Sequence, residues 1–262
     1  MPKIDIDGTV IHYISNRESL NPEEAQILYI HGTGCNARVF EQHINALPSY
    51  QAVALDLSGH GESGGAGYRG VVDHAHLVAE FMRRLGGHQW ILAGHSLGGG
   101  IALAVAIYYP EGLRGMMLID TGARLRVAPA MFENAKKIAA GHSDASTHSR
   151  LGFSDRTTQT TIDALWQITD KESSSVTLKD WYADDSCDFL TRVSEINLPS
   201  VAICGREDLF TPLKYHEYFR DHMPACELRV IDEAGHWPFV EQPARFNAEV
   251  IAYLSKLGEV GS

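Results

Sequence analysis

The sequence predicts an α/β protein built on a mostly parallel, doubly wound sheet, with an all-helical segment inserted into it. Short apolar runs typical of buried strands alternate with longer stretches of helical spacing. The alternation stops between residues 124 and 197, where helical spacing continues without a convincing strand. A glycine-flanked turn around Ser96 joins one predicted strand directly to one predicted helix.

The predicted strands begin with a hairpin. Residues 3–7 and 9–14 alternate apolar and polar side chains around Asp7-Gly8, a pair that favours a tight β-turn. Five later runs are continuously apolar, as expected for parallel strands that are buried on both faces. They are residues 26–30, 52–56, 90–93, 115–119 and 201–204. The last run, 228–231, is more mixed, which is typical of an edge strand.

Helical spacing predicts four helices between the strands, at residues 71–85, 97–109, 213–222 and 244–257. Pro110 supplies a stop signal for the second of them. Inside the inserted segment, apolar residues recur at helical spacing in three places. These are Met131, Ala135 and Ile138; Ile162, Leu165 and Trp166; and Leu178, Trp181 and Tyr182.

The domain prediction follows from this break in the pattern. Residues 1–123 and 198–262 are expected to form the core, and residues 124–197 a helical cap. Some bulky residues of the cap are candidates to roof a pocket beneath it, and the alternative is that they form the cap's own core. The candidates are Phe132, Leu165, Trp166 and Trp181.

Composition excludes several classes of function. The chain has 262 residues and a formal net charge of −11, so phosphate backbones and anionic membranes are unfavourable partners. The N-terminus has no apolar stretch of the secretory kind, and the longest apolar run, residues 101–107, cannot span a bilayer. We therefore expect a cytoplasmic protein that binds neither nucleic acid nor membrane.

No cofactor or metal is expected. None of Cys35, Cys187, Cys204 and Cys226 is paired at the Cys-x-x-Cys spacing of zinc or redox sites, and buried free thiols are the simpler interpretation. Residues 59–64 match Gly-x-Gly-x-x-Gly, but a dinucleotide site needs a helix to begin there, and residues 65–70 instead prolong the loop.

The strongest chemical signal is Gly94-His95-Ser96-Leu97-Gly98, between a predicted strand and a predicted helix. In this setting a serine projects its hydroxyl from the end of the sheet as a nucleophile, and the glycines leave room for the sharp turn. The helix N-terminus also directs free N–H groups toward the site.

The serine hydroxyl needs a base, and the base needs an orienting acid. His236 follows the last predicted strand, at the sheet edge where it can reach Ser96. Asp208 follows the strand at 201–204 and is the preferred acid, and Asp120, which ends the strand at 115–119, is its rival. His60 and His95 adjoin glycine-rich turns and are expected to line or shape the site.

An oxyanion hole completes the predicted site. One donor is expected to be the backbone N–H of Leu97, directly after the nucleophile, and the other that of Thr33, in the loop after the strand at 26–30. Two such donors, aimed at the charge that develops on the carbonyl oxygen, stabilise the transition state by roughly 3 kcal/mol each.

Together these residues resemble the α/β-hydrolase family, and specifically its carboxylesterases with a Ser-Asp-His triad. The landmarks run in the family's order along nearly the whole chain. They are His31-Gly-Thr-Gly, the stretch 56–63 (Asp-Leu-Ser-Gly-His-Gly-Glu-Ser), Gly94-His-Ser-Leu-Gly98, Asp208 and Gly235-His-Trp-Pro-Phe. The resemblance implies an eight-stranded sheet with a helical cap after the sixth strand. The loop 31–40 is also similar to that of carboxylesterases that demethylate pimeloyl-carrier-protein esters, with Thr33 where those have an aromatic residue.

The predicted function is hydrolysis of a small to medium carboxylic ester through an acyl-enzyme on Ser96, so the expected partner is a small-molecule acyl substrate. Carbon–carbon bond hydrolases, thioesterases and lactonases of this fold use the same triad, and the motifs do not separate them. A small-molecule receptor that retains the triad is the alternative from another class. Arg124 and Arg126, where the cap begins, are either solvated or available to a substrate carboxylate.

Overall fold

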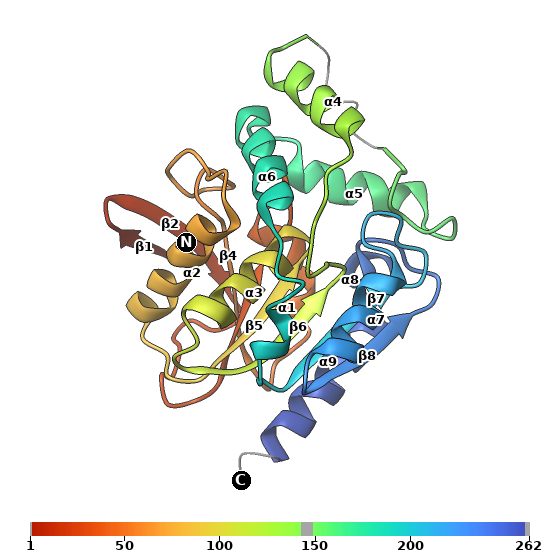
Figure 1. The fold of residues 1–262 in the computed structure, drawn as a ribbon. Helices are drawn as coiled ribbons and strands as arrows, with labels where there is room; N and C mark the ends of the chain where they lie inside the picture. Colours follow the sequence, from red (N-terminus) through yellow and green to blue (C-terminus); the bar gives the residue numbers. More distant parts are fainter. Residues whose placement is uncertain (1, 143–148, 260–262) are drawn as a thin grey trace.

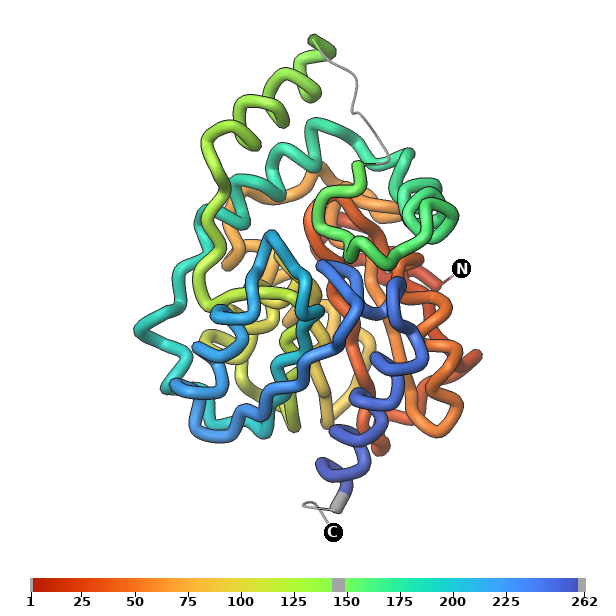
Figure 2. The backbone as a smooth tube through the Cα atoms, turned by 90° about the vertical axis from the view of Figure 1, so that its right-hand side faces the viewer, coloured from red at the N-terminus to blue at the C-terminus, as the bar shows by residue number. Residues whose placement is uncertain are grey.

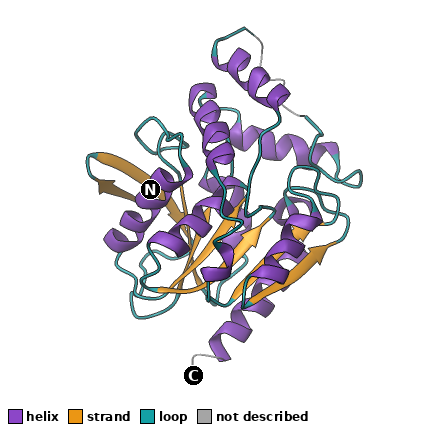
Figure 3. Cartoon of the chain, in the orientation of Figure 1, coloured by secondary structure: helices purple, strands orange, loops and turns teal. Residues whose placement is uncertain are grey.

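A computed structural model describes residues 2–142 and 149–259, and its core is one eight-stranded sheet (Figures 1 and 3). The strands are β1 (Lys3–Ile6), β2 (Thr9–Ser15), β3 (Gln26–Ile30), β4 (Gln51–Leu55), β5 (Trp90–His95), β6 (Leu113–Ile119), β7 (Ser200–Gly205) and β8 (Cys226–Ile231). Their order across the sheet is β1-β2-β4-β3-β5-β6-β7-β8. The predicted fold class, a mostly parallel sheet of this kind, is confirmed.

The hairpin and the edge strand lie where the sequence predicts them. Ile6 pairs with Thr9, and the two turn residues Asp7 and Gly8 have positive φ of 51° and 85°, as a two-residue hairpin with a right-handed twist requires. β1, β2 and β4 pair antiparallel, and every later pair is parallel. β8 ends the sheet, which explains its mixed composition.

Helices cover both faces of the sheet, and others lie beyond its end. The helices of the described residues are η1 (Ala37–Phe40), α1 (Glu41–Asn45), α2 (Val71–Leu85), α3 (Leu97–Tyr108), α4 (Pro129–Ala139), α5 (Gln159–Thr169), α6 (Ser174–Ser186), η2 (Val193–Glu195), α7 (Leu213–His222), α8 (Pro238–Glu241) and α9 (Pro243–Glu259). Side chains of α2, α3 and α7 share one apolar core with one face of the sheet, while those of η1, α1 and α9 share a second core with the other face. The central strands are therefore buried on both sides, as their continuous apolar runs predict.

The segment between β6 and β7 is helical, as predicted. Its described residues form α4, α5, α6 and η2, and their only β-type pairing is the isolated bridge between Arg124 and Asp188. Figure 1 shows α4, α5 and α6 beyond the end of the sheet toward which the parallel strands point, opposite the C-terminal end of α9. In the rotated view of Figure 2, α4 projects farthest from the sheet.

The candidate roof residues divide into three groups. Phe132 of α4 packs on Tyr182 of α6, with ring centroids 5.1 Å apart, so it belongs to the segment's own packing. Leu165 and Trp166 of α5 instead join the core cluster that contains Phe153 and Trp237. Trp181 is partly exposed on α6. The helical spacing therefore located the helices, while the second group alone approaches the residues around His236.

The short helices η1, α1 and α8 were not predicted. Cys35, Cys187 and Cys204 are buried and Cys226 is partly buried, and all four thiols are free. No helix in residues 2–142 or 149–259 combines the length and apolar character that crossing a bilayer requires. The glycine-rich segment 59–64 is followed by further loop, since α2 begins only at Val71.

Candidate active site

Ser96 lies on a strained turn between β5 and α3. Its backbone has φ 54° and ψ −120°, a conformation that costs a non-glycine residue energy and that functional sites retain. Gly94 and Gly98 make the turn possible: a Cβ on Gly98 would lie 2.1 Å from the Ile30 carbonyl oxygen, and one on Gly94 would lie 2.2 Å from the Gly98 carbonyl oxygen. The strand, sharp turn and helix predicted around Ser96 are all present.

Hydrogen bonds from neighbouring elements hold this turn. The Ser96 N–H donates to the Ile119 carbonyl of β6 (3.0 Å), and the Ser96 carbonyl accepts from the hydroxyl of Thr121 (2.7 Å) and from the N–H of Gly99 (2.9 Å). These bonds tie the serine backbone to the end of β6 and to the first turn of α3. They leave the half-buried hydroxyl of Ser96 as the group that the turn presents.

His236 and Asp208, 28 residues apart in the chain, are brought together. His236 Nδ1 lies 2.8 Å from Asp208 Oδ2, and both residues are buried. The backbone N–H of His236 donates to the Gly152 carbonyl at 2.6 Å. Because Asp208 accepts at this nitrogen, Nδ1 carries a proton and Nε2 of a neutral ring is free to accept one.

His95 connects Ser96 to this pair. Its Nε2 lies 2.7 Å from the His236 carbonyl oxygen, which can only accept, so Nε2 carries the proton. Burial, and secondly the nearby His236, lowers the pKa of His95 to about 3, so this ring stays neutral. The rings of His95 and His236 have centroids 4.8 Å apart. His95 therefore shapes the site, as expected, by fixing the backbone of the candidate base.

Asp208 is held as a carboxylate. It accepts four hydrogen bonds, from the N–H groups of Phe210 (2.7 Å) and Thr211 (3.1 Å), the Thr211 hydroxyl (2.6 Å) and His236. Burial opposes ionisation, but His236 and these donors outweigh it and lower the pKa of Asp208 well below its usual range. The neighbouring Glu207 turns away and accepts from the Asp155 N–H.

The rival acid Asp120 is close to the same pair. Its carboxylate oxygen, one from Asp208 and a ring nitrogen of His236 all lie within 4.8 Å of one another. Such a spacing can also hold a cation, but Nδ1 of His236 and the oxygens of Asp208 are already used in hydrogen bonds. Both acids considered from the sequence thus reach one place, and only Asp208 bonds to the histidine.

The two expected oxyanion donors belong to segments that meet at Ser96. Leu97 begins α3, where a first-turn N–H has no partner inside the helix. A Cβ on Gly32 would lie 2.9 Å from the Cβ of Ser96, so the chain passes directly beside the serine just before Thr33. The Thr33 hydroxyl is engaged elsewhere, donating to Asp184 Oδ2 at 2.6 Å.

Two acidic side chains of α6, which the sequence analysis did not identify, bind the loop that carries Thr33. Asp180 Oδ2 accepts from the Gly34 N–H (2.9 Å) and lies 2.8 Å from His60 Nε2, while Asp184 accepts from Thr33. We call these two acids the α6 carboxyl pair. Burial opposes the charge on His60, but Asp180 outweighs it and raises the pKa of His60. In the sequence, Asp180 and Asp184 could have been identified as a pair from their i,i+4 spacing, which places both acids on one face of a helix.

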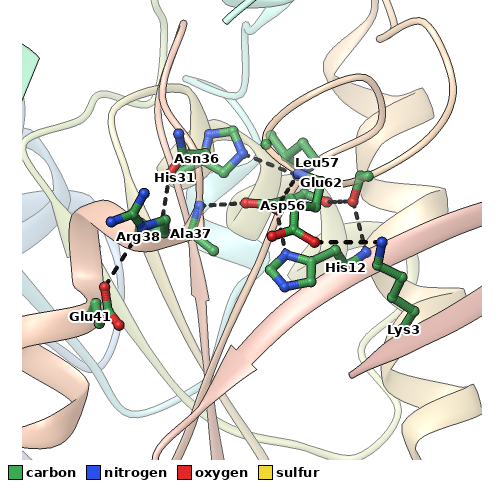
Figure 4. A network of polar contacts seen from close by, with 12 residues as sticks. Lys3, His12, His31, Asn36, Ala37, Arg38, Glu41, Asp56, Leu57 and Glu62 are labelled. Carbon is green, nitrogen blue, oxygen red and sulfur yellow. Dashed lines mark hydrogen bonds and ion pairs between the residues drawn. The ribbon is translucent and has the colours of Figure 1, made fainter. Parts of the chain in front are cut away.

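Asp56, at the end of β4, supports the same loop from beneath (Figure 4). One of its carboxylate oxygens accepts from the Ala37 N–H at 2.7 Å, and the other accepts from the Glu62 N–H at 2.9 Å and lies 2.6 Å from His12 Nδ1. Figure 4 shows these bonds converging on Asp56. They join β2, β4 and the start of η1, so the loop that carries Thr33 is anchored at its far end.

The two arginines that begin the inserted segment are paired within the protein. Arg124 Nη2 lies 2.6 Å from Asp188 Oδ2 and Arg126 Nη2 lies 3.6 Å from the same oxygen. Arg126 also donates to the Asp185 carbonyl at 3.0 Å. Both side chains are largely exposed, which agrees with the simpler interpretation of solvated arginines on a connecting segment.

The family model described as the alpha/beta hydrolase family matches residues 27–249. The chain belongs to the α/β-hydrolase family. A solved thermophilic esterase is similar to it, with a TM-score of 0.84, 30% sequence identity and 98% of each chain covered. This α/β hydrolase is therefore an enzyme of the hydrolase class.

Two curated relatives of this α/β hydrolase differ in their named substrates. A 2-hydroxy-6-oxononadienedioate/2-hydroxy-6-oxononatrienedioate hydrolase of Burkholderia vietnamiensis is 26% identical over 95% of this chain and 93% of its own. A pimeloyl-[acyl-carrier protein] methyl ester esterase of Neisseria meningitidis is 27% identical over 88% of this chain and 94% of its own. The similarity thus extends over nearly the full length of both relatives.

Proposed function

We propose that this α/β hydrolase cleaves small to medium carboxylic esters through an acyl-enzyme on Ser96, with His236 as base and Asp208 as orienting acid. The observation that carries the proposal is the His236–Asp208 hydrogen bond of 2.8 Å, in a site whose serine occupies a strained strand-to-helix turn. The relatives named as an esterase and as a methyl ester esterase support ester chemistry.

In the proposed mechanism, the Ser96 oxygen attacks the ester carbonyl while its proton moves to Nε2 of His236. The tetrahedral oxyanion accepts hydrogen bonds from the N–H groups of Leu97 and Thr33. The His236 proton then passes to the departing alcohol, which leaves the acyl-enzyme. Water repeats the sequence: His236 takes its proton, the hydroxide attacks the acyl carbonyl, and Ser96 regains its proton as the carboxylic acid leaves.

The inserted segment 124–197 is proposed to act as a cap over this site. Phe153, Trp166 and Trp237 form a contiguous aromatic group, and Phe210 and Trp237 each contact the His236 ring edge-on at 5.1 Å. Apolar walls of this kind bind acyl chains by removing them from water, at about 0.8 kcal/mol per buried methylene. These walls support a preference for apolar acyl groups of limited length.

The cytoplasmic location of the protein remains a prediction from the sequence.

A second candidate is hydrolysis of a carbon–carbon bond in a dicarboxylate, which the named Burkholderia relative favours. Such a substrate needs a cationic group for its carboxylate. The two arginines nearest to the start of the cap are already paired with Asp188 and Asp185. The ester therefore remains the better supported substrate.

The test is a panel of p-nitrophenyl esters, thioesters, lactones and a vinylogous diketone, run with wild type and with Ser96→Ala. We expect the short and medium esters to be turned over fastest and Ser96→Ala to abolish their turnover. Faster turnover of the diketone would replace the ester by the second candidate. Tight ligand binding in wild type without any turnover would instead indicate a receptor.

A further inference from the structure

Asp120 lies at the end of β6, beside the proposed catalytic acid Asp208. It follows β6 with φ 38°, a positive value that is uncommon for residues other than glycine, and it is completely buried. Its N–H donates to the Ile203 carbonyl of β7 at 3.0 Å, and its Oδ1 accepts from the Gly205 N–H at 2.9 Å. The carboxyl is thereby fixed against β7 at the point where the chain turns toward Asp208.

The second oxygen of Asp120, Oδ2, lacks among the described residues the hydrogen-bond donors that a buried ionised carboxylate needs. Oδ2 receives no hydrogen bond from any N–H or O–H donor within the described part of the chain, although it is fully buried. An anionic oxygen without a donor is costly in such a place. Asp208 is the neighbouring acid, and two carboxylates at this separation do not both remain ionised.

The hydrogen bonds decide which of the two acids keeps the proton. Asp208 accepts four bonds, one of them from His236, and these stabilise its charge. Asp120 accepts one, from Gly205. Burial and the negative charge of Asp208 raise the pKa of Asp120 well above its usual range, in agreement with these contacts.

We propose that Asp120 is a protonated positioning residue whose O–H donates to the Asp208 carboxylate. The pair then carries one negative charge, and this charge faces His236. The proton stays on Asp120 throughout turnover, so no proton is gained or lost by the pair when His236 accepts one from Ser96. This proposal deepens the proposed function, since it assigns the roles of Asp208 and His236 as above.

Other titratable groups around Asp120 do not replace this proton. The groups that face it or its partner are Asp208, His236, His216, Cys204 and Glu241. His216 Nε2 accepts from the Thr121 N–H, and burial lowers the pKa of His216 to about 4, so it carries no charge at neutral pH. Glu241 is satisfied by the N–H groups of Gly235 and Trp237 and by Thr157 and Ser154.

Infrared difference spectroscopy tests the proton without requiring any turnover. At pH 7, we expect the spectrum of Asp120→Asn to lack a protonated-carboxyl C=O band that the spectrum of wild type contains. This band then appears as a positive feature in the wild type minus Asp120→Asn difference. The control is Asp221→Asn, at an exposed aspartate whose pKa is lowered by Arg220, which should remove carboxylate bands alone. Loss of carboxylate bands on Asp120→Asn would overturn the proposal, even if the enzyme proves to act on a different substrate.

Activity and histidine titration test the positioning role. Asp120→Asn keeps an N–H donor toward Asp208 and no charge, so kcat/KM should fall less than about 10-fold and the His236 titration followed by NMR should not move. Asp120→Val removes the donor and should shift that titration and lower kcat/KM further. A loss on Asp120→Asn of about 10⁴-fold, the effect expected of the orienting acid itself, would contradict the proposal. Should both variants fail to fold, ¹³C-carboxyl NMR of wild type must still show one protonated aspartate beside Asp208.

Discussion

Replacing Asp184 by asparagine is expected to change how stability depends on pH while leaving the contact with Thr33 in place. Asp184 belongs to the α6 carboxyl pair, is 5% exposed, and accepts the Thr33 hydroxyl bond of 2.6 Å. Burial raises the pKa of Asp184 to about 8; the Thr33 bond lowers it and the nearby Asp180 raises it further. An asparagine side chain is neutral throughout and still offers a carbonyl oxygen to Thr33.

The expected magnitude follows from proton linkage. The pKa of Asp184 in the folded protein, about 8, lies above the ordinary value of 3.8, so between these values the folded state holds a proton that the unfolded state has lost. The free energy of unfolding must then fall as pH rises, by up to about 1.4 kcal/mol per pH unit. Between pH 6 and 8 wild type should lose about 2 to 3 kcal/mol relative to Asp184→Asn.

Urea denaturation followed by circular dichroism at pH 5, 6, 7 and 8 measures this difference. His60 contributes in the same direction, because its raised pKa gives stability that is lost as pH rises, but it is present in both proteins. The exposed Asp221→Asn serves as the control and should follow wild type over this range. Parallel curves for wild type and Asp184→Asn would show that Asp184 is already ionised and would refute the reasoning.

The remaining predictions concern the site and its frame. A fluorophosphonate should label Ser96, and an adduct found by mass spectrometry on another serine would contradict the assignment. Asp208→Asn should lower kcat by about 10⁴-fold in steady-state assays, because asparagine favours the wrong tautomer of His236, and an effect below 10-fold would oppose that role. Gly98→Ala should destabilise the fold by about 2 kcal/mol or more, because its Cβ would lie 2.1 Å from the Ile30 oxygen. Its control Gly258→Ala, in open space on α9, should stabilise by about 0.5 to 1 kcal/mol in the same urea titration. Arg124→Ala should not change the ratio of rates on a neutral ester and its ω-carboxylate analogue, because Asp188 already pairs with Arg124.

The sequence was most informative where local chemistry determines structure. Continuous apolar runs located the parallel strands because burial on both faces leaves no polar alternation. Asp7-Gly8 located the hairpin because both residues must adopt positive φ. The turn at Ser96 was predicted from its glycines, because a side chain on Gly98 would collide with the Ile30 backbone and one on Gly94 with the Gly98 backbone.

Contacts between distant segments were harder to predict. The Thr33–Asp184 bond joins residues 151 positions apart, and no periodicity in either segment specifies its partner. The ion pair of Arg124 with Asp188 was missed for the same reason. Asp120 and Asp208 were weighed as rivals because each follows a strand, and only the three-dimensional arrangement places both acids at one point. The helix η1–α1 was missed because it is short and follows a loop rich in turn residues.

The α6 carboxyl pair has a consequence for engineering. Residues 124–197 are an attractive unit to exchange between members of the family when a new acyl specificity is wanted. In this protein the exchanged unit would carry away Asp180 and Asp184, and with them the acceptors for Gly34, His60 and Thr33. A transplanted segment must therefore either bring equivalent acids or be matched by replacing His60 and Thr33 in the recipient. Segment exchange here is a problem of matching two surfaces rather than of joining two chain ends.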